Sequence, residues 1–276
     1  MPSTAVKVEE LPILKLPQNH SNISYKHYRT GLTTNQLETI VELQSKLLSS
    51  DFEFTNKEKV WCSERCLVRY LKATSWDVDA AKKRLESTLL WRREYQPDEI
   101  TPEEVEPEAL TGKSFVTGFN KDACPVIYLL PQRENTKTYD RQIRFAVYNI
   151  EKALKIMPDG VHSIVILVDY EHLSLANATP LSTSRKFLDI FQNHYPEILH
   201  SALVVNPSWY VSVFLRMVTP FMDPITRKKI QLVYLNSRDS QTPQDHIPSD
   251  QLITEYGGEY HMPWNFEIYW NEFTKL

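Results

Sequence analysis

The most constraining stretch of this chain is an apolar segment of eleven residues, Ser208 to Val218, with the sequence SWYVSVFLRMV. Its apolar residues fall nearly all round a helix, whereas a surface helix of a soluble protein shows a single apolar stripe. Eleven residues are too few to cross a bilayer. The segment therefore lies wholly inside the protein or spends part of its time against another apolar body.

Polar and charged residues flank this segment, with Glu197 before it and Thr226 to Lys229 after it. Thr226 and Lys229 are three residues apart, so one helical turn would place the hydroxyl and the ammonium on one side. A carboxylate accepts hydrogen bonds from hydroxyls, whereas Thr and Lys donate to phosphate or hydroxyl oxygens. The ordinary interpretations are a solvated acid, an N-cap and a surface charge. Together, an apolar wall and a polar, anion-binding end suit a lipid.

Composition excludes several classes of protein. The net charge of -4 argues against a general nucleic-acid binder. Three cysteines are too few, and odd in number, for a disulfide framework. The sequence shows neither a signal-peptide pattern nor an apolar run of about 18 residues. We therefore expect a reduced, cytoplasmic protein that contacts membranes only peripherally.

The chain divides into an N-terminal arm (1–32), a helical domain (33–109) and a second domain (110–276). Apolar periodicity predicts the helices of the first domain, and the acidic, proline-bearing residues 98–110 predict a linker. The predicted helices are Thr33–Ser49, Lys59–Lys72 and one that starts at the N-cap Asp77 and ends before Pro97.

Short β-branched runs alternate with helical stretches after residue 110. Strands that are apolar on both faces and alternate with helices indicate an α/β fold, with a mostly parallel sheet covered by helices. The predicted strands are Pro125–Leu130, Ser163–Asp169, Ala202–Val205 and Ile230–Leu235, and the predicted helices are Tyr139–Met157, Thr183–His194 and a short one stopped by Gly257 and Gly258.

No catalytic constellation stands out in the sequence. The six glycines form neither a G-x-G-x-x-G turn nor a phosphate loop, and there is no G-x-S-x-G nucleophile motif. Cys62 and Cys66 would share a helix face, but no second ligand pair follows at a spacing that suits a metal. We expect a protein that is not an enzyme, with no catalytic residue, metal or cofactor.

Several motifs carry a family resemblance. HYPE (194–197), NPSW (206–209), PFMDPIT (220–226) and EYGGEY (255–260) occur at characteristic separations after CLVRYLKATSW (66–76). On these residues the sequence resembles the CRAL-TRIO lipid-binding family, and within it the fungal phosphatidylinositol transfer proteins. The segment RENTKT (133–138) is similar to the branch linked to pleiotropic drug resistance.

The resemblance implies a hydrophobic lipid pocket that has the sheet as its floor and a gate helix, Pro207–Val218, as its lid. It also implies a phosphatidylinositol headgroup site. Thr74 and Ser75 replace basic residues of the family, which leaves Arg69 and Lys72 as the local cations. The headgroup residues are therefore expected to be Glu197, Thr226, Lys229, Arg69 and Lys72, and those of the gate Trp209, Tyr210, Val213, Phe214 and Met217.

The implied function is exchange of one phospholipid between membranes, in support of phospholipid and sterol homeostasis. Ile164 and Ile166 stand where the founding member offers hydroxyls to phosphatidylcholine, so we expect weak phosphatidylcholine exchange and leave room for a sterol as second ligand. The membrane surface would be a transient partner, at the endoplasmic reticulum or lipid droplets. The alternative is a lipid sensor that presents lipid to, or recruits, a partner such as a lipid kinase or decarboxylase.

Overall fold

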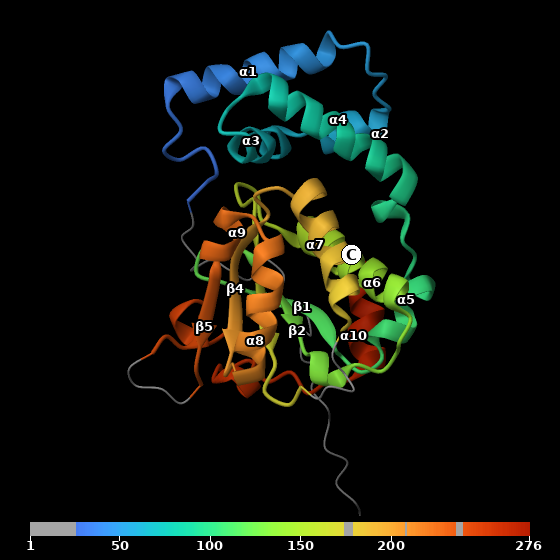
Figure 1. The fold of residues 1–276 in the computed structure, drawn as a ribbon, viewed down its shortest axis with the longest axis vertical. Coiled ribbons are helices and arrows are strands. Elements are labelled where there is room, and N and C mark those ends of the chain that lie inside the picture. Colours follow the sequence, from blue (N-terminus) through green and yellow to red (C-terminus); the bar gives the residue numbers. More distant parts are fainter. Residues whose placement is uncertain (1–25, 174–178, 208, 236–239) are drawn as a thin grey trace, which may run out of the picture.

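The structure, a computed structural model, describes residues 26–173, 179–207, 209–235 and 240–276. A group of helices lies at one end of the long axis, and an α/β body makes up the rest (Figure 1). Each part has its own hydrophobic core. Residues 1–25 of the expected arm lie outside the described residues, and the exact domain bounds stay a prediction.

The helical group is built from amphipathic helices with strong start signals. Thr33 and Thr55 each form a capping box with the residue three positions on, and Asp77 accepts a hydrogen bond from the Ala80 amide. Leu43 and Leu85 are fully buried in its core. The helices are α1 (Thr34–Leu48), α2 (Asn56–Trp61), α3 (Glu64–Ala73) and α4 (Val78–Tyr95).

The expected linker at residues 98–110 is wrong. After the short turn η2 (Pro97–Glu99), the chain forms helix α5 (Pro102–Ala109), which packs against α6 (Tyr139–Ile156). Thr101 caps this helix and Pro102 occupies its first turn, where the missing N–H costs nothing. The proline that indicated a break in fact starts a helix.

The sheet has five strands in the order β1-β2-β3-β4-β5, and β2 to β5 are parallel as predicted. The sequence did not predict β1, which pairs antiparallel with β2 at one edge. Residues of β1, β2 and β3 are almost all buried, which explains the continuous apolar composition of β2 and β3. The strands are β1 (Ser114–Phe119), β2 (Pro125–Leu129), β3 (Ile164–Asp169), β4 (Leu199–Val205) and β5 (Ile230–Val233).

Helices lie over the sheet, and α8 (Trp209–Val218) runs beside β4 in the view of Figure 1. The aromatic tail, for which no helix was predicted, forms α10, and the expected helix before Gly257 is only a short 3-10 turn, η6. Besides α6, the elements of this part are η3 (Pro131–Arg133), α7 (Leu181–His194), α8 (Trp209–Val218), η4 (Thr219–Phe221), α9 (Pro224–Lys228), η5 (Pro243–Asp245), η6 (Thr254–Tyr256) and α10 (Phe266–Phe273).

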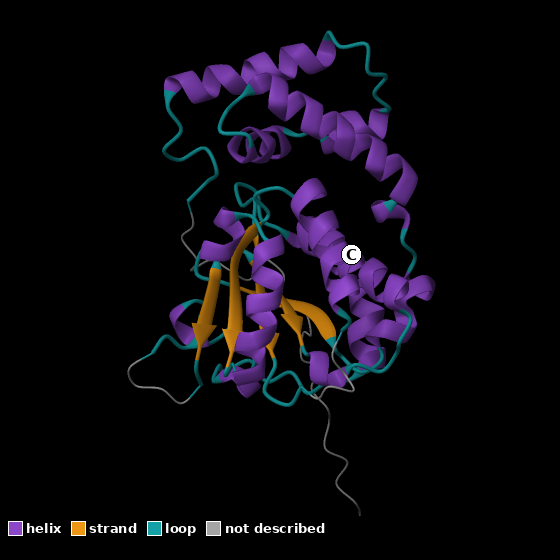
Figure 2. Cartoon of the chain, viewed as in Figure 1, coloured by secondary structure: helices purple, strands orange, loops and turns teal. Residues whose placement is uncertain are grey.

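The amino ends of the parallel strands face the helical group, because the arrows of β4 and β5 point away from it (Figure 2). Side chains of α3 fasten the two parts together. Tyr70 donates from its hydroxyl to the His194 carbonyl at 3.3 Å, and Arg69 Nη1 donates to the Pro196 carbonyl at 3.4 Å. The loop between α7 and β4 is thus held between α3 and the sheet.

Candidate functional site

An apolar cavity of about 320 Å³ lies between one face of the sheet and helices α6, α7 and α8. Its volume falls in the range of about 300–1,000 Å³ that is typical of small-molecule sites. Leucine, isoleucine, valine and phenylalanine dominate the wall. The apolar lining includes Ile127, Leu129, Ile166, Val168, Ala202, Val204, Phe145, Ala146, Ile150, Phe187, Leu188, Phe191, Leu215 and Val218.

Helix α8, the expected gate, forms one wall of this cavity. Leu215 and Val218 line the cavity, and Val211 is 1% exposed. Val213 and Met217 lie on the outer face instead, 44% and 49% exposed. The side chains of the other expected gate residues, Trp209, Tyr210 and Phe214, lie outside the described residues. The helix is apolar on both faces, in agreement with its composition.

Thr226 lies at the end of the cavity nearest β5, and Lys229 follows it in the chain, between α9 and β5. Thr226 lines the cavity from within α9. The residue before this helix is Asp223, whose carboxylate accepts a hydrogen bond from the Thr226 amide at 2.9 Å. The N-cap is therefore Asp223, and the Thr226 hydroxyl is not needed for that role. Lys229 Nζ lies 3.2 Å from Glu197 Oε2. Glu197 has a φ of 54°, a left-handed conformation that few residues other than glycine adopt.

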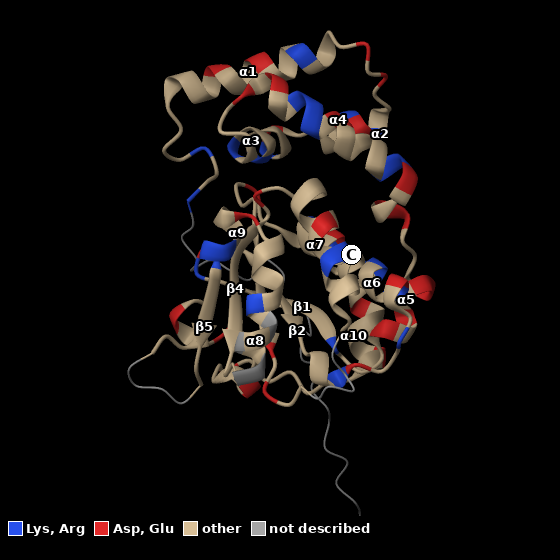
Figure 3. Cartoon of the chain, in the orientation of Figure 1, with Lys and Arg blue, Asp and Glu red and all other residues tan. Residues whose placement is uncertain are grey.

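The helical group brings two further expected residues to the same place. Arg69 is buried. Burial lowers the pKa of the Lys72 ammonium, while the Glu197 carboxylate raises that pKa and the Lys229 ammonium lowers it further. Figure 3 shows basic residues on both α3 and α9. Lys229 and Lys72 thus act on the Glu197 carboxylate. Arg69 binds the carbonyl of Pro196, the preceding residue, and Thr226 lines the cavity.

Sequence reasoning missed Arg65 and His162 in this cluster. Arg65 donates from Nη1 to the Val161 carbonyl at 3.1 Å, and burial together with the neighbouring Arg69 lowers its pKa. The spacing of Arg65, Arg69 and Lys72, four and three residues apart, places them on one helix face and could have identified Arg65. Burial and the nearby cations Lys72, Arg69 and Lys229 lower the pKa of His162 to about 4. Burial first, and the cationic neighbours after it, thus disfavour the charged form of this imidazole.

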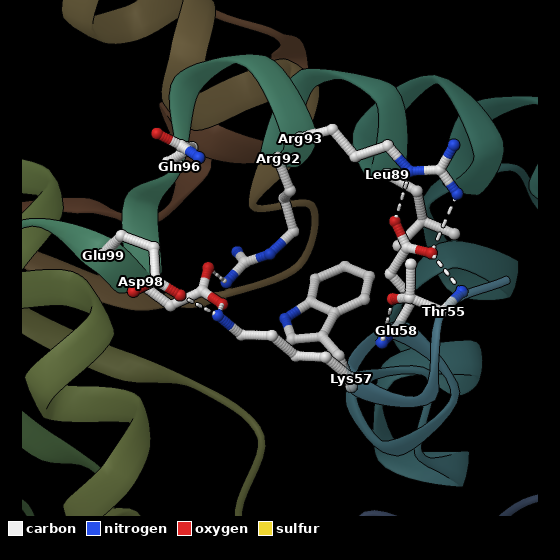
Figure 4. Close-up of a pocket in the computed structure, with 10 residues that line it drawn as sticks. Thr55, Lys57, Glu58, Leu89, Arg92, Arg93, Gln96, Asp98 and Glu99 are labelled. Atoms are coloured by element: carbon white, nitrogen blue, oxygen red, sulfur yellow. Dashed lines mark hydrogen bonds and ion pairs between the residues drawn. The ribbon is translucent and has the colours of Figure 1, made fainter.

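A second, smaller cavity of about 160 Å³ lies in the helical group, between α2 and α4 (Figure 4). Its charged side chains are already paired: Arg92 with Asp98 at 2.7 Å, and Arg93 with Glu58 at 2.6 Å. Arg92 also reaches Glu151 of α6 at 2.8 Å. Because these charges neutralise one another, we interpret this region as an ion-paired contact between the two parts of the protein rather than as a ligand site.

Other kinds of site find no support within the described residues. No group of three or more His, Cys, Asp or Glu residues among them could hold a metal ion. None of the described helices is long and apolar enough to cross a membrane. Asp169, at the carboxyl end of β3, is buried and accepts from the Tyr256 hydroxyl at 3.0 Å, so it stabilises the core.

Comparisons with known proteins agree with this arrangement. Residues 110–258 match the family model described as the CRAL/TRIO domain, and residues 36–87 match the one described as CRAL/TRIO, N-terminal domain. The crystal structure of Sfh5 has the same fold, with a TM-score of 0.60 and 18% identity over 84% of this chain and 89% of that chain.

Two fungal relatives are similar in sequence. Phosphatidylinositol transfer protein PDR17 of Saccharomyces cerevisiae is 31% identical over 98% of this chain and 79% of its own length. A CRAL-TRIO domain-containing protein of Schizosaccharomyces pombe is 38% identical over 79% of this chain, which spans only 21% of that protein. With family models matched in both parts and a relative aligned over nearly its whole length, the chain belongs to the CRAL-TRIO family of lipid-binding proteins.

Proposed function

We propose that this chain is a phosphatidylinositol transfer protein, which binds one phospholipid in the cavity and exchanges it between membranes. The observation that carries the proposal is the continuity of the apolar cavity with Thr226, beside the cluster of Lys229, Glu197, Lys72 and Arg69. Acyl chains would fill the apolar part. The inositol hydroxyls and the phosphate would meet the hydroxyl, the carboxylate and the cations, which match both kinds of oxygen.

Transfer would depend on the rate of gate opening rather than on a gain in burial. Each buried methylene is worth about 0.8 kcal/mol, and a lipid in a bilayer already has that benefit. Opening of α8 at a membrane would let the chains move between two apolar environments without meeting water. The outer face of the segment suits such a contact, because Val213, Met217, Phe221 and Ile225 are exposed beside the cation Arg216. The protein would thus work in the cytoplasm and visit membranes peripherally.

Vesicle assays test the proposal directly. Purified protein is expected to move labelled phosphatidylinositol between vesicles well above the buffer rate, and labelled phosphatidylcholine at least about 10-fold more slowly. Ile166 lines the cavity and Ile164 is fully buried, and neither can satisfy the oxygens of a choline phosphate. Phosphatidylinositol transfer no faster than buffer would contradict the proposal, and mass spectrometry of copurified lipid is an independent check.

Gln192 of α7 holds the end of the gate closed. Its side-chain amide donates to the Phe221 carbonyl at 2.9 Å and accepts from the Asp223 amide at 2.7 Å, so it bridges α7 to the segment between α8 and α9. Gln192→Leu is expected to speed release of labelled lipid to acceptor vesicles by about 5- to 10-fold, because two hydrogen bonds of about 0.5–1.5 kcal/mol each are lost. Asn193→Leu, at the exposed neighbouring position, should leave the rate unchanged. An unchanged rate in Gln192→Leu would show that this bridge does not limit opening.

The acidic residues 98–108 are the sequence feature that favours the alternative function, a sensor that recruits a partner enzyme. The structure uses much of that charge internally: Asp98 pairs with Arg92, Glu104 with Arg144, and Glu108 with both Lys113 and Arg141. The segment therefore offers much less free negative charge to a partner than its composition indicates.

A further inference from the structure

The cavity has a second polar corner, far from the expected headgroup site. Thr226 precedes β5 and lies at the amino edge of the parallel strands. Ser114 begins the antiparallel β1 and pairs with Leu129 at the carboxyl end of β2. Because the strand order runs from β1 to β5, Ser114 and Thr226 lie at diagonally opposite corners of the sheet. Both residues line the same cavity.

Asn149 of α6 meets Ser114 at this corner. Its Nδ2 donates to Ser114 Oγ at 3.0 Å, and both residues line the cavity. Asn149 is completely buried, yet its Oδ1 has no hydrogen-bond partner among the described residues. A buried acceptor without a donor costs about 1–3 kcal/mol, so such an atom calls for a ligand or an internal water.

The charges next to this corner are already neutralised. Lys113, which also lines the cavity, pairs with Glu108 and, at 2.6 Å, with Glu134. Arg141 lies on the other oxygen of Glu108 at 2.6 Å. Two cations thus face two carboxylates. A charged headgroup would find no free partner here, whereas a neutral donor fits the vacant Asn149 acceptor.

We infer that Asn149 and Ser114 form a hydroxyl-binding subsite for a neutral lipid, one that carries a single hydroxyl at the end of an apolar body. The lipid hydroxyl donates a hydrogen bond to Asn149 Oδ1. It also accepts a hydrogen bond from the Ser114 hydroxyl, whose oxygen in turn accepts from Asn149 Nδ2. Sterols and diacylglycerols share this chemistry. The inference rests on the proposed lipid-carrying function and identifies the group that would select a second ligand.

The test compares lipids with and without the hydroxyl. Cholesterol and dioleoylglycerol are each measured against the analogue in which hydrogen replaces the hydroxyl, by competition for the purified full-length chain. The hydroxylated lipid of at least one pair is expected to bind about 10-fold more tightly. Asn149→Leu should reduce this ratio to about one while the deoxy analogue still binds, which shows that the cavity is intact. Asn193→Leu, the matched change on the exposed face of α7, should keep the full ratio.

Each other outcome is decisive. A ratio near one for both pairs in the unaltered protein overturns the subsite, and so does a ratio that persists in Asn149→Leu. Should that variant fail to fold, Ser114→Ala provides the second measurement, with a ratio that must fall. If the protein binds phosphatidylinositol normally but does not distinguish the hydroxylated lipid from its deoxy analogue, only the subsite is rejected. If the protein binds no lipid at all, the proposed function is rejected.

Discussion

The double variant Thr226→Asp, Lys229→Ala is expected to lower phosphatidylinositol transfer by at least about 100-fold, to the rate of buffer. The new carboxylate would stand in the cavity wall next to the phosphate, and the ammonium that faces Glu197 would be gone. Hydrogen bonds to charged groups are worth about 1.5–3 kcal/mol each, and 1.4 kcal/mol is a factor of ten in affinity. The measurement is transfer of labelled phosphatidylinositol between vesicles.

A neutral lipid distinguishes loss of the headgroup site from loss of the cavity. Binding of cholesterol should survive in the double variant, because its hydroxyl does not need the Thr226 corner. Lys186→Ala removes an exposed lysine of α7 and should transfer phosphatidylinositol normally. Equal loss of both lipids in the double variant would mean that the headgroup residues are wrongly assigned.

Arg92→Met is expected to lower the free energy of unfolding by about 3–5 kcal/mol, a large part of the roughly 5–15 kcal/mol of a typical domain. The Arg92 side chain is 7% exposed and lies between Asp98 and Glu151, which is 13% exposed. Methionine would fill the space but leave the Glu151 carboxylate buried without its counter-ion. Among the described residues, the partner that remains for Glu151 after this loss is the Tyr195 hydroxyl, which donates to it at 2.6 Å. Urea denaturation measures the loss.

An exposed ion pair of the helical group supplies the control. The Lys46 side chain is 38% exposed, and its partners Glu42 and Asp79 are 55% and 81% exposed, so water screens both pairs. Lys46→Met should therefore lower the free energy of unfolding far less than Arg92→Met. Similar losses of unfolding free energy in the two variants would show that the ion-paired contact in Figure 4 stabilises the protein no more than a surface ion pair does.

The sequence predicts β2, β3 and β4 because burial on both faces produces apolar runs, and it predicts β5 from the apolar residues Ile230, Leu232 and Val233, although this strand is only partly buried. It failed for β1, whose sequence SFVTGF includes polar residues and a glycine. This segment becomes a strand by pairing antiparallel with β2, which follows after the short connection of residues 120–124, and its own residues form neither an apolar run nor a regular alternation. Helix α5 is missed for another reason: prolines in a sequence usually indicate a break, but Pro102 stands in the first turn, where a helix tolerates proline.

The sequence predicts those residues of the candidate site that lie close together in the chain or within a recognisable motif. Thr226 and Lys229 share one helical turn, and the motif around Glu197 carries a family resemblance. The subsite at Asn149 has no such pattern, since its partner Ser114 lies 35 residues away and only the fold brings the two together. Its vacant acceptor is visible only once every buried polar atom has been assigned a partner.

The position of the headgroup cluster has a consequence for the empty protein. Arg69 and Lys72 belong to the helical group, whereas Lys229 and Glu197 belong to the α/β body, and each part has a separate core. A bound phosphate would therefore act as a non-covalent cross-link between two independently packed units. Bound lipid would stabilise the folded chain by mass action. After the lipid is released at a membrane, the two parts would be held together less strongly and the folded chain would be least stable.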